Sequence, residues 1–439
     1  MRTDHPDTTT SHAERARRHQ RDRDHVWHPW SPLHADRSEL TIARGDGYRV
    51  WDDDGNEYLD ALSLNTTCGY RHPWVMEAVA RQMDRLHQFD LSRASHEPAG
   101  ELAQRLAGML PAGLERTLFV NSGSEAFEAA VLIASQHWSH VGDPRSRVVS
   151  FALGYQGATL MARSLSRLPR VGHPFHAPFA VTAVELPLPP SRLREVTACE
   201  RLLERFAWAI GEDPADRPLA VVVEPFLNVG GGVVLPPGFL RALAELCRER
   251  DTLLVLDEVF TAFGRTGSVF ALDHEGVVPD ILVTSKGLAG GYMPIGAVTV
   301  EERVHRSFDR DPVLGGVRYG HTTSGHPVAC AAALATLDVI ESEGLARWAA
   351  QAGRELLGHL APLAACPDVV DVRGFGLLVV VETSTPEVAD RMADRARRAG
   401  LLLRRPGAGE VLMAAPPLTI DREGIDLLAE RLSHAVTSR

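Results

Sequence analysis

Lys286 is the only lysine among the 46 lysine and arginine residues of the chain, so the other 45 are arginines. An arginine guanidinium stays protonated and is a poor nucleophile, whereas a desolvated lysine amine can attack an aldehyde and form an imine. A chain that uses arginine wherever positive charge suffices, and still keeps one lysine, indicates a covalent role for Lys286. The alternative is that Lys286 is a chance survivor on a solvated face.

Asp257 is a second residue that could do chemistry. The run Thr252–Asp257 is typical of a buried strand, and it leads directly into the acid pair Asp257-Glu258. The carboxyl ends of strands are where ligands bind in parallel sheets. A carboxylate at this place could keep the ring nitrogen of an imine-forming cofactor such as pyridoxal phosphate protonated, which lets the ring accept electrons. A helix cap after the strand is the alternative role for Asp257.

A second buried run, Asp280–Ser285, leads directly into Lys286 and is followed by Gly290 and Gly291. The chain between the two runs carries the turn Gly264–Gly267 and is long enough for one crossover between parallel strands. We therefore expect the aspartate and the lysine to lie at neighbouring strand ends, in one crevice.

Two further segments offer groups that could hold a cofactor. In Asn121–Ala126 a turn of small residues precedes a predicted helix over Glu125–Trp138, and backbone N–H groups at a helix N-terminus attract a phosphate. Tyr155 follows the predicted strand Arg147–Phe151 and could stack on an aromatic ring. Alone, such a turn is usually a helix cap and such a tyrosine a packing residue, so only their combination with the lysine and the aspartate favours a site.

These residues require a framework of alternating strands and helices. Between about residues 75 and 330, short β-branched runs alternate with amphipathic helical stretches, which is typical of a mostly parallel sheet covered by helices. The predicted strands are Thr117–Asn121, Arg147–Phe151, Leu219–Glu224, Thr252–Asp257 and Asp280–Ser285. We expect an α/β fold in which residues 75–330 form a large domain.

The two ends of the chain are predicted to form a smaller α/β domain. Leu40–Leu64 has the alternation of an antiparallel hairpin with a turn at Asp54-Gly55, and the chain returns to helix, strand and helix after about residue 335. We predict that residues 25–74 and 331–439 pack together as this domain. Residues 1–24, rich in polar and charged residues and without the apolar stretch of a signal peptide, are predicted to form a disordered tail.

Composition excludes several classes of protein. The chain has 439 residues, 44% of them hydrophobic, and a net charge of -11, which allows a large core but offers no basic surface for nucleic acid. Its apolar runs are too short to cross a bilayer. The five cysteines include no C-x-x-C pair, which argues against a disulfide framework or a zinc site and favours the cytoplasm. We expect a cytoplasmic enzyme without a metal ion, and without nucleic-acid or membrane partners.

In their order along the chain, these motifs resemble those of the class III pyridoxal-phosphate aminotransferases of fold type I, over nearly the whole chain after residue 25. Phe119–Glu128 is similar to the family's phosphate-binding turn and helix. Glu224-Pro225 with Gly230–Phe239 resembles its E-P, G-G and P-P-G-F-L stretch, and Asp257–Gly267 resembles D-E-V-x-T-G-F-G-R-T-G. The resemblance implies pyridoxal 5'-phosphate as the cofactor and Lys286 as the imine lysine.

The resemblance also implies roles for individual residues. Asp257 would pair with the pyridine nitrogen, Val259 and Tyr155 would enclose the ring, and Gly123 with Ser124 would hold the phosphate. A homodimer with shared active sites is implied as well, because His321–Pro327 resembles a segment that reaches the neighbouring site, where Thr322 would bind phosphate across the dimer. The implied cofactor-binding set is Ser122, Gly123, Ser124, Tyr155, Glu224, Asp257, Val259, Lys286 and Thr322, of which Lys286 and Asp257 are catalytic.

The substrate side departs from well-known members of this family. Val229 stands where ornithine- and GABA-type members carry a glutamate, which makes those activities less expected. The opening around Trp30 resembles diaminopelargonic acid aminotransferases, but the pair that begins at Asn65 replaces their two tryptophans, so a role in biotin synthesis is doubtful. Arg404 and Arg405 are adjacent candidates for binding a carboxylate, and we favour Arg405. The predicted substrate contacts are therefore Trp30, Asn65 and Arg405.

The predicted activity is transfer of an amino group from an amino donor to a carbonyl acceptor, through a Lys286 Schiff base and a pyridoxamine intermediate. Because the cofactor supplies the electronics and the pocket selects the bond, an amino-acid epimerase, racemase or aminomutase on the same scaffold is the alternative. Such an enzyme would release no keto product. A dinucleotide-dependent oxidoreductase is disfavoured, because Gly230–Gly232 leads into Pro236-Pro237 rather than into a helix.

Overall fold

A seven-stranded sheet forms the centre of the computed structural model, which describes residues 12–33, 40–168, 171, 179–407 and 409–438. Its strands are Leu114–Val120 (β4), Arg147–Phe151 (β5), Ala180–Val184 (β6), Ala220–Val223 (β7), Leu253–Asp257 (β10), Ile281–Thr284 (β11) and Gly296–Glu301 (β12). They lie in the order β4-β12-β11-β10-β7-β5-β6. Neighbours pair in parallel except around β12, which is antiparallel to both β11 and β4.

All the strands predicted from the sequence are present, as β4, β5, β7, β10 and β11. The strands β6 and β12 are not among the predicted ones. The direction of β12 follows from its short connection to β11, which holds a 3-10 helix over Lys286–Ala289 and a turn but has no room for a crossover. One reversed strand leaves the sheet mostly parallel, in agreement with the predicted α/β class.

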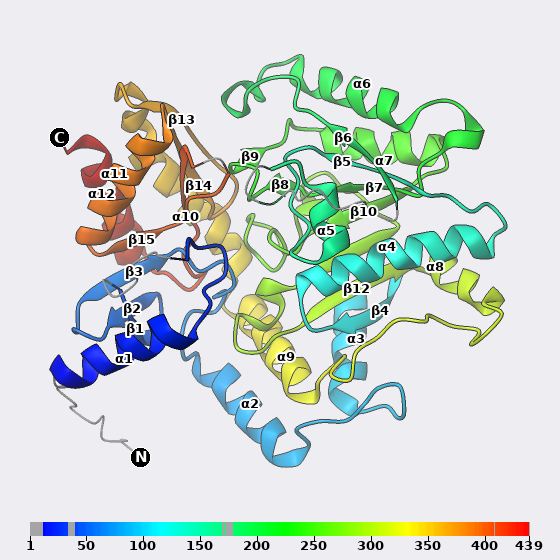
Figure 1. Cartoon of the computed structure of the whole chain (residues 1–439), viewed down its shortest axis with the longest axis horizontal. Coiled ribbons are helices and arrows are strands. Elements are labelled where there is room, and N and C mark those ends of the chain that lie inside the picture. The colour runs from blue at the N-terminus through cyan, green and yellow to red at the C-terminus, as the bar shows by residue number, and fades with distance from the viewer. Residues whose placement is uncertain (1–11, 34–39, 169–170, 172–178, 408, 439) are drawn as a thin grey trace.

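Helices cover both faces of this sheet (Figure 1). Side chains of a strand point alternately to the two faces, and in β10 Leu253 and Val255 belong to one apolar cluster while Leu254 and Leu256 belong to another. The first cluster is covered by Gly123–His140 (α4), Leu160–Leu165 (α5) and Glu302–Arg306 (α8). The second is covered by Glu97–Met109 (α3), Ala198–Ile210 (α6), Phe239–Glu249 (α7) and Pro327–Ser342 (α9).

Segments from both chain ends form the smaller part of the molecule, on the left of Figure 1. One sheet contains Ile42–Asp46 (β1), Arg49–Asp52 (β2), Glu57–Ala61 (β3) and Leu401–Leu403 (β15), in that order. β15 is parallel to β3, so the C-terminal chain completes the N-terminal sheet. A second sheet contains Val369–Gly374 (β13), Val379–Thr383 (β14) and Val411–Ala414 (β16). The predicted fold class, including a small α/β part built from both ends, is confirmed.

The remaining elements connect or cover these sheets. The helices are Pro73–Arg85 (α2), Leu345–Leu360 (α10), Pro386–Arg398 (α11) and Arg422–Thr437 (α12). A two-stranded antiparallel ribbon joins Phe226–Leu227 (β8) to Val233–Val234 (β9). In Figure 1, α2 projects from the lower edge of the molecule.

Residues His12–His25 form a helix (α1), so the expectation of a disordered tail is wrong for this part of residues 1–24. Polar contacts explain why this hydrophilic segment is ordered, because they connect the helix to the small domain. Arg15 forms an ion pair with Asp54, and Nε2 of His19 lies 3.2 Å from the hydroxyl of Thr41. These partners are far from α1 in sequence and cannot be seen in its composition. Residues 1–11 lie outside the described part of the chain.

Candidate active site

The predicted meeting of Asp257 and Lys286 is present in the structure. β10 and β11 are adjacent and parallel, and Asp257, the last residue of β10, stands opposite Val283 in β11. Lys286 follows β11 at the same edge of the sheet and has a backbone φ of +28°. This left-handed conformation is unfavourable for a residue with a side chain and is found mainly where the surroundings impose it, often at functional sites.

Three ionisable groups are buried together at this edge. Burial lowers the pKa of the Lys286 amine, although the charges of Asp257 and Glu224 oppose the shift. Burial raises the pKa of Asp257 to about 6, opposed by a hydrogen bond from the backbone N–H of Val259 (3.0 Å) and by the charge of Lys286. The pKa of Glu224 is raised well above its usual value by burial and by Asp257. Lys286, whose amine loses its proton more easily than usual, therefore lies close to two carboxyl groups, Asp257 and Glu224, whose negative charges a bound cation would stabilise.

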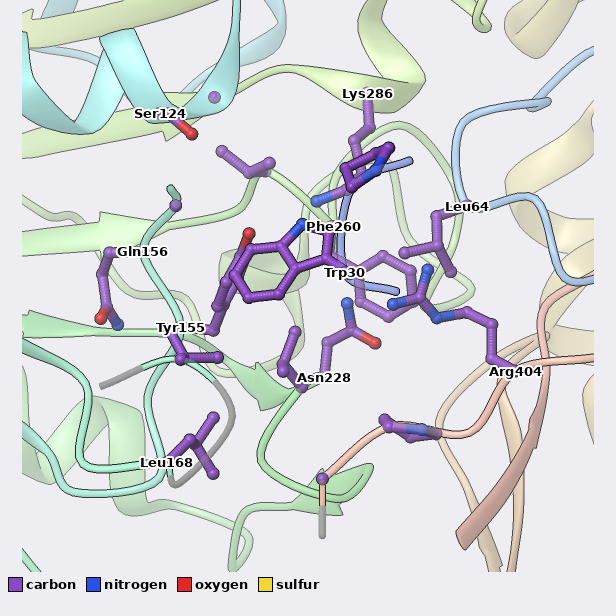
Figure 2. A pocket seen from close by; sticks show the side chains of 18 of the residues that line it. Trp30, Leu64, Ser124, Tyr155, Gln156, Leu168, Asn228, Phe260, Lys286 and Arg404 are labelled. Atoms are coloured by element: carbon purple, nitrogen blue, oxygen red, sulfur yellow. The ribbon is translucent and has the colours of Figure 1, made fainter. Parts of the chain in front are cut away.

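A cavity of about 1220 Å³ opens from this edge of the sheet. Its wall comes from segments that are far apart in the sequence, and Figure 2 shows several of their side chains converging on one space. The wall includes Gly123 and Ser124 of α4, Tyr155, Gln156, Glu224, Asn228, Asp257, Val259, Phe260 and Lys286, together with Trp27–Pro32, Leu64 and Arg404–Gly407 from the chain ends.

The start of α4 forms one end of the cavity and fits a phosphate group. Gly123 and Ser124 line the cavity at the N-terminus of this 18-residue helix, where free backbone N–H groups favour an anion. A side chain at Gly123 would come within 2.8 Å of Val259, so only glycine lets the helix approach so closely. The Ser124 hydroxyl accepts a hydrogen bond from the backbone N–H of Ala158 (3.0 Å). Ser122 does not line the cavity, and its hydroxyl caps α4 by accepting from the N–H of Glu125 (3.2 Å).

Tyr155 and Val259 are two further residues of the cavity wall, each held by its backbone N–H to one of the buried acids. The backbone N–H of Tyr155 donates to Oε1 of Glu224 (2.8 Å), which holds the loop after β5 against the end of β7. Val259 packs beside Gly123, as the close approach at that glycine requires. Both residues line the cavity, so the space between the strand ends and α4 is bordered by an aromatic and an aliphatic side chain. That border suits a flat, largely apolar ring.

Glu258 has a different role from its neighbour Asp257. Its carboxylate is fully buried and accepts hydrogen bonds from the backbone N–H groups of Ala271 (2.7 Å) and Leu272 (2.8 Å) and from the hydroxyl of Thr261 (3.1 Å). Glu258 therefore stabilises the start of the 3-10 helix Ala271–His274 and is not available to a ligand.

The predicted substrate residues lie in different surroundings. Trp30 is 60% exposed, lines the cavity and lies edge-on to the ring of Tyr155, with ring centroids 6.3 Å apart. Asn65 is exposed and does not line the cavity, whereas its neighbour Leu64 does. Thr322 is also exposed, and its carbonyl accepts from Nε2 of Gln88 (2.8 Å) rather than facing the cavity of its own chain.

The two adjacent arginines point in different directions. The guanidinium of Arg405 donates to the carbonyls of Pro386 (3.2 Å) and Gly409 (2.8 Å) and forms an ion pair with Asp390. Arg404 instead extends into the cavity in Figure 2, and its charge is close enough to lower the pKa of Lys286. The geometry therefore favours Arg404 over Arg405 as the cation that faces a ligand.

Several wall residues are absent from the sequence prediction, notably Leu64, Asn228 and Phe260. Phe260 belongs to the recognised Asp257–Gly267 motif, and its ring centroid lies 5.7 Å from the amine of Lys286. Asn228 precedes a glycine run, which gives a weak signal of a turn near a site. No cluster of three or more metal-binding side chains occurs among the described residues.

Comparison with known proteins gives a consistent result. The family profile described as Aminotransferase class-III matches residues 32–436. A curated relative from Nitratidesulfovibrio vulgaris, adenosylmethionine-8-amino-7-oxononanoate aminotransferase, is 37% identical over an alignment covering 94% of this chain and 80% of the relative. An (S)-enantioselective omega-transaminase from Thermomicrobium roseum is 33% identical with a TM-score of 0.89, over 96% of this chain and 98% of that one. The omega-transaminase from Pseudomonas jessenii, solved in complex with PMP, is 31% identical with a TM-score of 0.88, over 95% and 97% of the two chains.

Proposed function

Because this chain belongs to the class-III aminotransferase family, and therefore transfers amino groups with pyridoxal 5'-phosphate, we propose that Lys286 and Asp257 form its catalytic centre. The observation that carries this proposal is that the only lysine and the aspartate lie at the ends of two adjacent parallel strands and line the same cavity. When bound, the cofactor supplies an aldehyde for the lysine and a ring that accepts the electrons of a broken bond.

Lys286 and Asp257 would have different roles in the reaction. The amine of Lys286 would bond to the cofactor and, once the substrate amine displaces it, would move the proton of the carbon that carries that amine. Its lowered pKa favours the neutral form that this task needs. The carboxylate of Asp257 would hold the ring nitrogen protonated, because a cation at that place relieves the cost of a buried negative charge.

We propose that the rest of the cofactor occupies the space between α4 and the strand ends. Gly123, Ser124 and the backbone at the start of α4 would receive the phosphate, while Tyr155 and Val259 would border the ring. Ser122 would contribute through its backbone position, since its hydroxyl already caps the helix. Glu224 would act indirectly, through its hydrogen bond to the backbone of Tyr155.

For the substrate we propose Arg404 as the cation that receives a carboxylate, in place of Arg405. Trp30 would lie against the same substrate, because it covers the cavity from the side of the chain ends. Asn65 remains a predicted contact that a single chain does not bring to the cavity.

We also propose that the protein is a homodimer in which Thr322 completes the phosphate site of the partner. Two observations support a second copy of the chain as the partner that binds the surface around Thr322 and α2. Thr322 is exposed and does not line the cavity of its own chain, and the projecting helix α2 exposes Trp74 (52%), Met76 (48%) and Met83 (51%). Exposed apolar side chains gathered on one element are typical of an interface. Sedimentation of the holoenzyme measures the assembly directly: a dimer at assay concentration is expected, and an active monomer would exclude shared sites.

We propose a cytoplasmic location, supported by five cysteines that are all unpaired in the structure. Among the described residues, no helix has the length and apolar character needed to cross a membrane.

A single-turnover reaction tests the proposed activity. Holoenzyme is mixed with an amino donor in the absence of an acceptor, and both the cofactor absorbance and the keto product are followed. Transamination predicts one equivalent of keto product per site, released in parallel with loss of the visible absorption band. An epimerase, racemase or aminomutase would convert the substrate without releasing keto product. Formation of such products without keto acid or ketone would contradict the proposal.

A further inference from the structure

Nε of Arg404, a donor, and Oδ1 of Asn228, an acceptor, are buried atoms of the cavity wall that have no hydrogen-bond partner within the described residues. Oε1 of Gln156, on the same wall, is also without one. Asn228 is 2% exposed, and its side chain and that of Arg404 belong to the wall of the same cavity. Buried polar atoms are nearly always hydrogen-bonded in a working state of a protein, so an unpaired donor and an unpaired acceptor in one cavity call for an explanation.

The backbones of both residues are held in place. Arg404 exchanges two hydrogen bonds with Met413, its N–H donating over 3.0 Å and its carbonyl accepting over 2.9 Å. The carbonyl of Asn228 accepts from the N–H groups of Gly231 (3.4 Å) and Gly232 (3.1 Å). A side chain at Gly232, whose φ is +63°, would come within 2.6 Å of Val380, so this turn cannot shift freely. Adjustment between the two residues is therefore left to their side chains.

Few side chains near the two groups can form hydrogen bonds, although Tyr155 is close enough to Arg404 for each to shift the pKa of the other. Leu64 and Phe260, which line the same part of the cavity in Figure 2, carry no hydrogen-bonding side chain. Figure 2 shows the carboxamide of Asn228 and the guanidinium of Arg404 entering the central space from different elements. A guanidinium has five donors, so one bond to a carboxamide oxygen leaves its outer N–H groups free for a ligand.

We propose that Asn228 is a positioning residue for Arg404: its carboxamide oxygen accepts a hydrogen bond from the guanidinium and holds that cation facing the substrate. The enzyme would then prefer substrates that carry a carboxylate in addition to the group that exchanges the amine. This inference rests on the proposed function, in which Arg404 is the cation of the substrate site.

Matched substrates measure this preference without knowledge of the natural one. Alanine and isopropylamine differ by a carboxylate in place of a methyl group, and 5-aminopentanoate and pentylamine form a second pair with a remote carboxylate. The measured quantity is the ratio of kcat/KM between the acidic and the neutral member of each pair. In Asn228→Leu, which keeps the size but removes the acceptor, we expect this ratio to fall at least about tenfold in one pair, as for the loss of a hydrogen bond to a charged group. Asn228→Thr, which keeps an acceptor oxygen, should retain most of the ratio.

A double-mutant cycle with Arg404→Met separates positioning from direct contact. If Asn228 acts through Arg404, adding Asn228→Leu to Arg404→Met leaves the ratio where Arg404→Met alone puts it. An equal fall with and without the arginine, or an unchanged ratio in Asn228→Leu, would overturn the proposal.

Binding of hexanoate, compared with hexanol and measured by titration calorimetry, gives a readout that needs no turnover. Asn228→Leu should weaken hexanoate more than hexanol, and Asn228→Thr should not. If no amine is exchanged at all but hexanoate binding responds in this way, the proposed function fails while the positioning role stands. If transamination proceeds and hexanoate binding is the same in all variants, only the positioning role fails.

Discussion

The two ends of the cavity are built on different principles. The closed end, which we define as Lys286, Asp257 and Glu224, lies at the edge of the large sheet, where every strand residue of β10 and β11 is buried. The open end, defined as Trp27–Pro32, Leu64 and Arg404, comes from the chain termini and includes Trp27 at 85% and Trp30 at 60% exposure. In the proposed function, the chemistry therefore takes place in a fully buried part of the molecule and the substrate is recognised at its periphery.

Electrostatics separates the two ends as well. At the closed end, burial raises the pKa values of the two carboxyl groups and lowers that of the amine, and the charges of these groups act on one another. At the open end the cation of Arg404 has no carboxylate partner among the described residues that line the cavity beside it. We therefore expect changes at the closed end to abolish the reaction and changes at the open end to alter which substrate is used.

The largest effect is expected from removing the amine of the closed end. Lys286→Ala should lower turnover by at least about a thousandfold, because both covalent attachment and proton transfer are lost. Lys286→Arg is the matched control, since it keeps a positive charge but cannot form an imine. Both variants should lack the visible absorption band of the bound cofactor while keeping the far-ultraviolet circular dichroism of the fold. Activity in Lys286→Arg would show that charge alone is sufficient.

A smaller but still severe loss is expected at the neighbouring acid. Asp257→Asn should keep the cofactor and lose turnover by about 2 to 5 kcal/mol of transition-state stabilisation, because a neutral amide cannot hold the ring nitrogen protonated. Glu258→Gln is the adjacent control, since that side chain bonds to backbone groups away from the cavity. The measurement is kcat for both variants with one donor and acceptor pair. Equal losses would mean that the two acids share a structural role.

The dependence of stability on pH tests the burial of Glu258 independently of activity. Burial raises the pKa of Glu258 to about 7, above its usual 4.5. The folded state then holds this proton more tightly than the unfolded state, so the free energy of unfolding should fall as pH rises from about 4.5 to about 7. At roughly 1.4 kcal/mol per pKa unit, the fall is on the order of 3 kcal/mol. Denaturant titrations of wild type and Glu258→Gln at several pH values measure it, and the fall should be smaller in the variant, where the raised pKa values of Asp257 and Glu224 still contribute. Parallel pH curves would contradict the assignment.

The smallest effect is expected at the open end. Trp30→Ala removes the edge-on contact with Tyr155 and the approach of the Arg163 guanidinium to the Trp30 ring. Aromatic contacts of this kind are worth about 0.5–1.5 kcal/mol, so KM should change by roughly two- to tenfold while the cofactor band is retained. Trp27→Ala, at a more exposed position of the same segment, should change KM less. A loss of cofactor in Trp30→Ala would mean that the open end also holds the cofactor.

The closed end could be predicted from the sequence because it depends on order along the chain. Buried β-branched runs mark the strands, and parallel pairing brings their ends to one edge, so the positions of Asp257 and Lys286 in the sequence are enough to place them together. The small-residue turn before α4 is likewise a local signal. Ser122 shows the limit of such signals, because the sequence cannot tell that its hydroxyl is used as a helix cap.

The open end could be predicted only in part because it depends on contacts between distant segments. Which of two adjacent arginines faces the cavity is decided by Asp390 and the carbonyls of Pro386 and Gly409, which engage Arg405. Leu64 lines the cavity and its neighbour Asn65 does not, which depends on the course of the loop that carries both residues. Helix α1 is stabilised by residues of a hairpin that follows it, so its polar composition alone indicates disorder.

Reduction of the holoenzyme with borohydride, followed by mass spectrometry of its peptides, tests the central claim most directly. Reduction fixes an imine as a stable amine, and the chain offers only one lysine and its N-terminal amine as attachment points. The predicted result is one cofactor per chain, on the peptide that contains Lys286. Recovery of the cofactor on the N-terminal peptide, or a fully active enzyme in which no peptide is labelled, would contradict the assignment of Lys286 as the catalytic amine.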